Sequence, residues 1–112
     1  MKDDKLYLIH IRECIERVEK YTAEGGKGAF LVSTLIQDAV MRNLQTMAES
    51  TQRLSNATKE AHPGVDWYRI SGFRNVLVHG YLGVDLDRLW IIVERDLPGL
   101  RRAITSMLKE QQ

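Results

Sequence analysis

Residues 7–21 read YLIHIRECIERVEKY, and this stretch decides the fold class. Its apolar residues are separated by steps of three and four, which gather them on one face of a helix. The opposite face is charged, and an acid precedes a base by four positions at Glu16 and Lys20, a spacing that supports an exposed helix surface. The stretch therefore predicts an amphipathic helix that ends near Glu24, because glycines follow from Gly25 onward. Its buried face is predicted to hold Tyr7, Leu8, Ile11, Cys14, Ile15, Val18 and Tyr21.

The same spacing continues in a second helix, which we expect to begin between Ala29 and Thr34 and to run to about Leu54. Its buried face is predicted to hold Val32, Leu35, Ile36, Ala39, Val40, Leu44, Met47 and Ala48. Asn43 interrupts this apolar face, and buried amides are nearly always hydrogen-bonded. We therefore expect Asn43 to find a hydrogen-bond partner.

A turn-rich connector follows the second helix, SNATKEAHPGV at residues 55–65, with room for one short helical turn. Asp66 then stands where an N-cap is expected, so a third helix is predicted from Trp67 to about His79. Gly80 would loosen the end of that helix.

The last helical stretch is predicted to begin after Asp85, another residue type suited to an N-cap. Apolar residues keep steps of three and four across Pro98, at Leu86, Trp90, Val93, Leu97, Leu100, Ile104 and Met107. Because this spacing continues past the proline, the segment is predicted to be either one kinked helix or two helices that abut on the same core. Residues 1–112 are thus predicted to form a single all-α domain. We expect an antiparallel four-helix up-and-down bundle whose last helix is kinked or split at Pro98.

The composition narrows the classes of function. A hydrophobic share of 44% in 112 residues excludes a disordered chain and suits one core. The 16 basic residues nearly balance the 15 acidic ones, so any contact with nucleic acid must rest on a local basic patch. Cys14 is the one cysteine, the N-terminus is charged, and no apolar run approaches membrane-spanning length. We therefore expect a cytoplasmic protein with no membrane partner.

A second stretch, ISGFRNVLVHGYLGVDLDRLW at residues 70–90, places Arg74, Asn75, His79 and Tyr81 within eight residues. Such a set suits cleavage of a phosphodiester without a metal. Histidine titrates near neutral pH and can exchange a proton with a hydroxyl, while arginine can hold a phosphate through two hydrogen bonds. Asn75 could orient the imidazole, and Tyr81 offers a stacking surface or a hydroxyl that can be modified.

The geometry of this set leaves two possibilities open. Arg74 and His79 lie five positions apart, which is roughly 140° out of phase on an ideal helix. Either the helix loosens before Gly80, or the two side chains meet across a symmetric dimer. A simpler interpretation also stands, in which Arg74 is a solvated side chain near a helix end and His79 is a satisfied interface histidine.

The string RNVLVHGYLGVDLDRLW closely resembles the signature of the HepT-like toxins, which are members of the HEPN superfamily. That signature is an arginine, a polar residue, three further positions, a histidine, any residue and a tyrosine. This chain has Arg74, Asn75, His79 and Tyr81 at those places. The resemblance covers nearly the whole chain, through the segments IRECIERVEKYT, FLVSTLIQDAVMRNLQTMAES, AHPGVDWYRISG and DLPGLRRAITSML.

The resemblance implies a helical HEPN domain that acts as a metal-independent endoribonuclease, with Arg74 and His79 as catalytic residues in the composite cleft of a homodimer. It implies no cofactor. It also implies the toxin half of a toxin–antitoxin pair, whose partner is a minimal nucleotidyltransferase (MNT) antitoxin. That antitoxin would silence the toxin by adenylylation (AMPylation) of Tyr81, which brings negative charge and bulk beside Arg74 and His79.

The chain departs from the family pattern at one position. Many relatives of this kind have a second basic residue two positions after the arginine, where this chain has Val76. This chain would then bind RNA more weakly or use Arg69 or Arg88 as RNA contacts instead. The rival interpretation is a non-catalytic HEPN module that dimerises and binds a nucleotide or a partner protein.

No metal site is expected. His10 and Cys14 lie four positions apart, a spacing that metal ligands can use, but no further ligand pair accompanies them. Both residues fall on the apolar stripe of the first helix, so core packing is their expected role.

Overall fold

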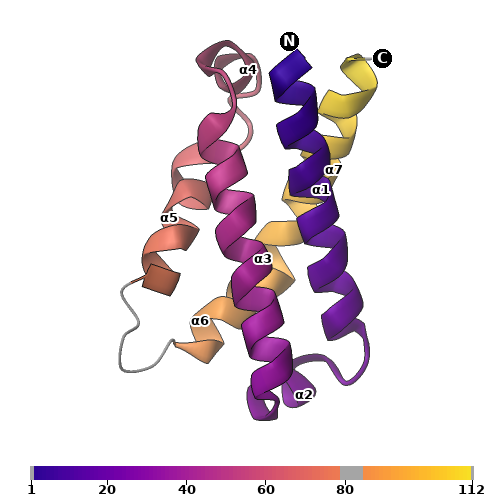
Figure 1. The fold of residues 1–112 in the computed structure, drawn as a ribbon, viewed down its shortest axis with the longest axis vertical. Helices are drawn as coiled ribbons and strands as arrows, with labels where there is room; N and C mark the ends of the chain where they lie inside the picture. Colours follow the sequence, from indigo (N-terminus) through magenta and orange to yellow (C-terminus); the bar gives the residue numbers. More distant parts are fainter. Residues whose placement is uncertain (1, 79–84, 112) are drawn as a thin grey trace.

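Within residues 2–78 and 85–111, which the computed structural model describes, the chain folds into four main helical segments that run alternately up and down (Figure 1). The elements are α1 (Lys2–Ala23), α2 (Gly26–Val32), α3 (Thr34–Arg53), α4 (Asn56–Ala61), α5 (Trp67–Val78), α6 (Leu86–Ile91), the π-helical turn η1 (Ile92–Asp96) and α7 (Leu97–Glu110). Among these helices, none combines the length and the apolar character needed to cross a membrane. The predicted all-α antiparallel four-helix bundle is confirmed.

α3 is the central helix of the bundle. It packs along α1 and along α5, while α7 packs on α1 (Figure 1). The buried side chains confirm most of the predicted apolar faces, and they include Leu8, Ile11, Ile15, Val18, Val40, Leu44, Met47 and Ile104. Asn43 donates from Nδ2 to the carbonyl oxygen of Ala39 at 2.8 Å, so it has the expected hydrogen-bond partner, within its own helix. Tyr21 differs from the prediction, because it is exposed at the end of α1.

The predicted buried face is wrong at the start of the second helix. Val32 and Leu35 are 84% and 80% exposed. Val32 ends α2, and Ser33 has an extended backbone (φ −112°, ψ 109°) before α3 begins at Thr34. This change of direction takes both side chains to a corner of the bundle, away from the buried positions that begin at Val40. A spacing rule that assumes one continuous helix does not detect such a corner.

The expected glycine break after α1 is confirmed, but it leads directly into α2, a short helix that the spacing does not predict. Gly25 turns the chain with φ +83°, and a Cβ there would lie 2.6 Å from the Cβ of Ala29. α2 buries Phe30 completely, with its ring centroid 5.4 Å from that of Trp90 in α6. This aromatic pair fixes α2 and α6 against each other.

The last helix crosses Pro98 without ending. The backbone at Ile92, Asp96 and Leu97 stays right-handed helical, so α6, η1 and α7 form one continuous segment. The N–H of Leu97 donates to the carbonyl of Ile92, five residues earlier, which is the bond of a π turn. A proline lacks an N–H and crowds the preceding turn, and a wider turn just before it relieves that conflict. Of the two predicted alternatives, the structure has a single helix, interrupted by a π turn rather than split.

Both predicted N-caps are confirmed. The Asp66 carboxylate accepts from the N–H of Arg69 at 2.9 Å at the start of α5. Asp85 accepts from the N–H of Arg88 at 3.2 Å at the start of α6. The connector between α3 and α5 contains α4, the short helical turn expected there.

A buried carboxylate ties the start of α1 to this connector. Asp4 is 2% exposed and accepts hydrogen bonds from the N–H and hydroxyl of Ser55, at 2.9 and 2.6 Å, and from the hydroxyl of Thr58 at 2.6 Å. Burial disfavours the charged form of Asp4, but the hydrogen bonds from Ser55 and Thr58 outweigh it. The pKa of Asp4 is therefore lowered below the ordinary value of an aspartate.

We expect Asp4→Asn to lower the free energy of unfolding at pH 7 by about 1–3 kcal/mol, because hydrogen bonds to a buried charge are lost. Since folding lowers the pKa of Asp4, its contribution is present above the ordinary aspartate pKa of about 3.9 and is lost as the pH falls through the lower folded-state value. The unfolding free energies of the two proteins, measured in urea at decreasing pH, should therefore begin to converge below about pH 4. Asp38→Asn, at an exposed position of α3, is the control and should change stability by less than about 0.5 kcal/mol. An equal loss in the control would contradict the role given to Asp4.

Candidate functional site

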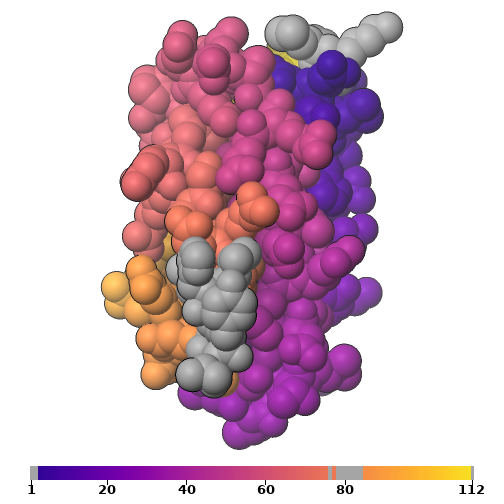
Figure 2. All heavy atoms as spheres, turned by 60° about the vertical axis from the view of Figure 1, so that its left-hand side comes forward, coloured from indigo at the N-terminus to yellow at the C-terminus, as the bar shows by residue number. Residues whose placement is uncertain are grey.

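α5 has a buried face and an exposed face. Ile70 and Phe73 are buried in the core, and Leu77 packs partly against it. Arg74 and Asn75 are exposed. Figure 2 turns this side of the molecule forward, with the surface of α5 above that of α6 and beside that of α3. The polar residues of α5 are therefore exposed between its two neighbours, α3 and α6.

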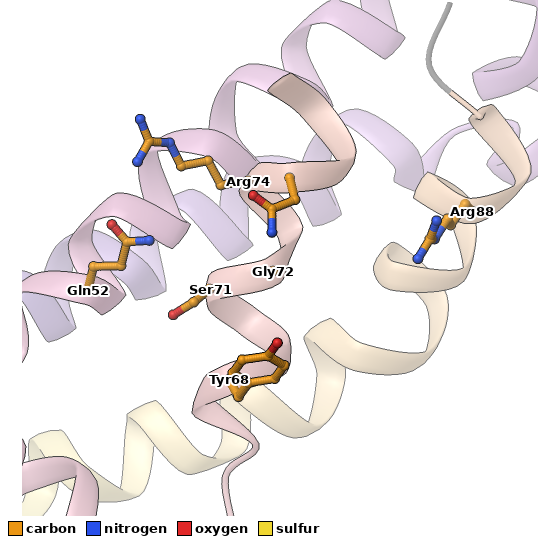
Figure 3. Close-up of a pocket in the computed structure, with 7 residues that line it drawn as sticks. Gln52, Tyr68, Ser71, Gly72, Arg74 and Arg88 are labelled. Atoms are coloured by element: carbon orange, nitrogen blue, oxygen red, sulfur yellow. The ribbon is translucent and has the colours of Figure 1, made fainter. Parts of the chain in front are cut away.

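An open hollow of about 560 Å³ lies over the exposed face of α5. α3 contributes Gln52 to its lining and α6 contributes Arg88, from opposite sides of α5 (Figure 3). The lining residues from α5 are Tyr68, Ser71, Gly72, Arg74 and Asn75. Among the described residues, the lining thus contains two arginines and no carboxylate. This local excess of positive charge suits an anionic group such as a phosphate.

The structure brings three of the predicted site residues, Arg74, Asn75 and Arg88, to this hollow. Arg74 has no ion pair among the described residues, so none of them competes with a ligand for its guanidinium. His79 and Tyr81 lie outside the described residues. α5 is described from Trp67 to Val78, and the predicted end of this helix at about His79 lies outside the described residues.

The two arginines predicted as possible RNA contacts have different surroundings. Arg69 donates to Asp96 of η1 from Nε at 2.9 Å and from Nη2 at 3.0 Å. These hydrogen bonds raise the pKa of Arg69 and tie α5 to the last helix. Arg88 lines the hollow and has no carboxylate partner in the described part of the chain. The geometry therefore leaves Arg88, rather than Arg69, open to an anionic ligand.

A second hollow, of about 350 Å³, adjoins the first, because Tyr68, Gly72 and Arg88 line both. Phe73 from α5 and Ile91 from α6 add apolar surface to this second hollow. Tyr68 itself is 91% exposed. The two hollows thus form one continuous surface feature, mainly polar at one end and partly apolar at the other.

Four lining residues have no counterpart in the sequence-based prediction, namely Gln52, Tyr68, Ser71 and Gly72. A signal was present for three of them. Tyr68, Ser71 and Gly72 precede Asn75 by seven, four and three positions, a spacing that places side chains on one side of a helix. Gln52 comes from another helix, so no spacing within α5 could indicate it.

Two polar residues of α1, His10 and Cys14, belong to a separate cluster. His10 Nδ1 lies 2.6 Å from Ser50 Oγ, and Cys14 Sγ lies 3.6 Å from His10 Nε2 and 3.4 Å from Thr46 Oγ1. Burial raises the pKa of Cys14, which keeps the thiol neutral and unreactive. The cluster links α1 to α3, so His10 and Cys14 contribute to packing between helices.

Comparison with known proteins gives relatives along almost the whole chain. A protein of Thermococcus cleftensis named "Probable ribonuclease HepT" is 34% identical over 108 residues, which cover 96% of this chain and 98% of that protein. A predicted RNase of Methanocaldococcus jannaschii is 32% identical over 103 residues, with 92% of this chain and 94% of that protein covered. A longer protein of the same organism, described as a gamma-glutamylcyclotransferase and predicted RNase, is 35% identical over 109 residues. This chain spans about half (49%) of that protein's length.

No solved structure matches the chain. Residues 11–107, however, match the family model described as Ribonuclease HepT-like. With that match and with relatives above 30% identity over nearly its full length, the chain belongs to the Ribonuclease HepT-like family of the HEPN superfamily.

Proposed function

We propose that the chain is a metal-independent endoribonuclease with Arg74 and His79 as its catalytic residues. The observation that carries the proposal is the position of Arg74, exposed in a hollow whose described lining has two arginines and no carboxylate. His79 follows Arg74 by five positions, in a chain whose relatives bear ribonuclease names. Arginine and histidine together can supply the charge stabilisation and the proton transfer that phosphodiester cleavage needs.

In the proposed reaction His79 accepts the proton of a ribose 2′-hydroxyl, whose oxygen attacks the adjacent phosphorus. The bond between phosphorus and the 5′ oxygen breaks, and that oxygen takes a proton from water, while the resulting hydroxide takes the proton from the His79 imidazolium. Negative charge builds on the phosphoryl oxygens, where Arg74 stabilises it through two hydrogen bonds. Asn75, four positions before His79, orients the imidazole. The products are a 2′,3′-cyclic phosphate and a 5′-hydroxyl.

We place this reaction in a homodimer. Positions 74 and 79 of one regular helix point about 140° apart, so a single chain would not bring both side chains to one phosphate. A two-fold contact through α5 would bring two copies of the Arg74–His79 pair to one composite cleft.

We further propose that the chain is the toxin of a toxin–antitoxin pair, silenced when an MNT antitoxin transfers AMP to Tyr81. Tyr81 follows His79 by two positions in the sequence. An AMP group there would bring negative charge and bulk to a surface that carries Arg74 and Arg88. It would therefore compete with RNA for the same cations.

The test is RNA cleavage by the purified chain in excess EDTA, beside His79→Ala and Tyr81→Phe, with the mass of each preparation measured. We expect the wild type to cut RNA and His79→Ala to lose about 10²–10⁴-fold in rate, the usual contribution of a general acid–base. On addition of the antitoxin and ATP, the wild type should gain AMP and stop cutting, while Tyr81→Phe should do neither.

Four results would contradict parts of this proposal. If unmodified wild type does not cut RNA, the chain is instead a non-catalytic module that binds a nucleotide or a partner. If His79→Ala cuts RNA as fast as the wild type, His79 is not a catalytic residue. A monomer by light scattering at micromolar concentration would refute the dimer. AMP transfer to Tyr81→Phe would refute the modification site.

A further inference from the structure

We propose that the hollow beside Tyr68 binds one unpaired nucleobase of a single-stranded RNA, stacked on the Tyr68 ring. The inference rests on the proposed ribonuclease function and names the part of the substrate held away from the scissile phosphate. Tyr68 is 91% exposed in the first turn of α5. A lone exposed ring is not a site, but this one lines both hollows together with Arg88.

The charges around Tyr68 match a nucleotide. Arg88 lines both hollows, and Arg74 lines the larger one. Single-stranded nucleic acids bind where aromatic side chains take the bases and nearby cations take the backbone. A base on Tyr68 would thus have a phosphate at Arg88, while the Arg74 side chain points to the opposite side of α5, the side of Gln52 (Figure 3).

The smaller hollow offers the base an apolar wall. It has a volume of about 350 Å³, and Phe73 and Ile91 contribute to its lining beside Tyr68. Small-molecule sites typically start at about 300 Å³ and combine apolar walls with a few polar groups. Asp66, also in the lining, supplies an acceptor for the polar edge of a base.

Gly72 is an independent reason to expect a ligand here. A glycine inside a helix is less favourable than an alanine, because the unfolded glycine has more conformational freedom to lose. The fold of the described residues does not require one: Gly72 has no positive φ, and a Cβ there would meet none of their atoms within 4 Å beyond its chain neighbours and its own helix backbone. Gly72 lines both hollows, so its missing side chain keeps open the space between them. Gly72 thus makes the helix less stable at a position where a larger side chain would fill the proposed subsite.

The lining favours RNA over a protein partner. The larger hollow is mostly polar, with Gln52, Ser71 and Asn75 beside the two arginines. The centres of protein interfaces are depleted in charged residues, whereas nucleic-acid interfaces are polar and positively charged.

The test uses the full chain carrying His79→Ala, which should bind RNA without cutting it. Fluorescence anisotropy compares two labelled probes, an oligouridylate and an abasic ribose-phosphate strand of the same length. Adding Tyr68→Ala should weaken binding of the oligouridylate by about 5- to 150-fold, the effect of one lost base stack, and leave the abasic strand unchanged. Arg88→Gln should weaken both probes and lower the salt slope by about 0.7, because it acts on a phosphate.

Two further variants separate this effect from misfolding. Tyr21→Ala, at an exposed tyrosine of α1 that lines neither hollow, should bind both probes like the parent protein. Gly72→Leu should not lower the Tm, since leucine favours a helix more than glycine does. It should nevertheless weaken binding of the oligouridylate, because its side chain fills the hollow.

The possible failures are distinguishable. If Tyr68→Ala binds the oligouridylate as tightly as its parent while the wild type cuts RNA, the base subsite is refuted and the proposed function stands. If Tyr68→Ala turns a dimer into a monomer by light scattering, Tyr68 is a contact between copies and the subsite is again refuted. A wild type that neither binds nor cuts RNA refutes both.

Discussion

We expect Arg74→Gln to lower kcat/KM for RNA cleavage by about 100- to 1,000-fold, the usual effect of removing one donor that stabilises charge in the transition state. Glutamine keeps a polar, though shorter, side chain but loses the charge and the two parallel N–H groups. Thermal stability should stay within about 0.5 kcal/mol of the wild type, because Arg74 is exposed and forms no ion pair with the described residues. Initial rates and thermal unfolding of the same preparations measure both quantities.

Two other substitutions sharpen this prediction. Arg102→Gln changes an exposed arginine of α7 that lines neither hollow, so rates and Tm should match the wild type. Arg74→Lys keeps the charge without the planar fork, and its loss should fall between those of wild type and Arg74→Gln. If Arg74→Gln cuts RNA as fast as Arg102→Gln, Arg74 has no catalytic role.

Mixing inactive variants tests where the two catalytic side chains meet. Consider a mixed dimer of one Arg74→Gln chain and one His79→Ala chain. If each active site takes its arginine from one chain and its histidine from the other, one of the two sites in this dimer is intact. If each site lies within one chain, neither site is intact. Recovered activity on mixing therefore assigns the pair across the two-fold axis, and no recovery assigns it to a single chain.

The bundle could be predicted from the sequence because one-sided burial repeats every three to four residues along a helix. Leu8 and Leu44 lie on predicted faces and are fully buried. N-caps were also predictable, because a carboxylate such as Asp66 acts on the first turn that follows it. The errors at Val32 and Leu35 have a different origin. The corner they occupy depends on α2, whose packing is decided by a contact with α6 far along the chain.

The candidate site was predictable only in part for the same reason. Because Phe73 lies on the buried face of α5, helical spacing alone is enough to expect Arg74 and Asn75 on an outer face. The hollow itself takes side chains from three helices, so it exists only in the folded chain. Arg69 and Arg88 likewise look equivalent in the sequence. Their difference arises from tertiary structure, which places Asp96 within hydrogen-bond distance of Arg69.

Phe30→Ala should cause the largest loss of stability among the substitutions considered, about 3–5 kcal/mol of unfolding free energy. The Phe30 side chain is fully buried and its ring lies against that of Trp90, so alanine would leave a cavity between α2 and α6. α6 also carries Arg88, and a shift of α6 into this cavity would move the guanidinium relative to the hollow. RNA affinity should therefore fall as well, although Phe30 lines neither hollow.

Urea unfolding measures the stability change, with an unchanged m-value as the sign that the transition stays cooperative. The matched control is Val32→Ala, an apolar-to-alanine change two positions away in α2 at a side chain that is 84% exposed. It should change stability by less than about 0.5 kcal/mol, because almost no buried surface is lost. Comparable losses in the two variants would mean that Val32 is buried in solution. The apolar face expected from spacing alone would then hold through the start of α3, and the corner formed by α2 would be wrong.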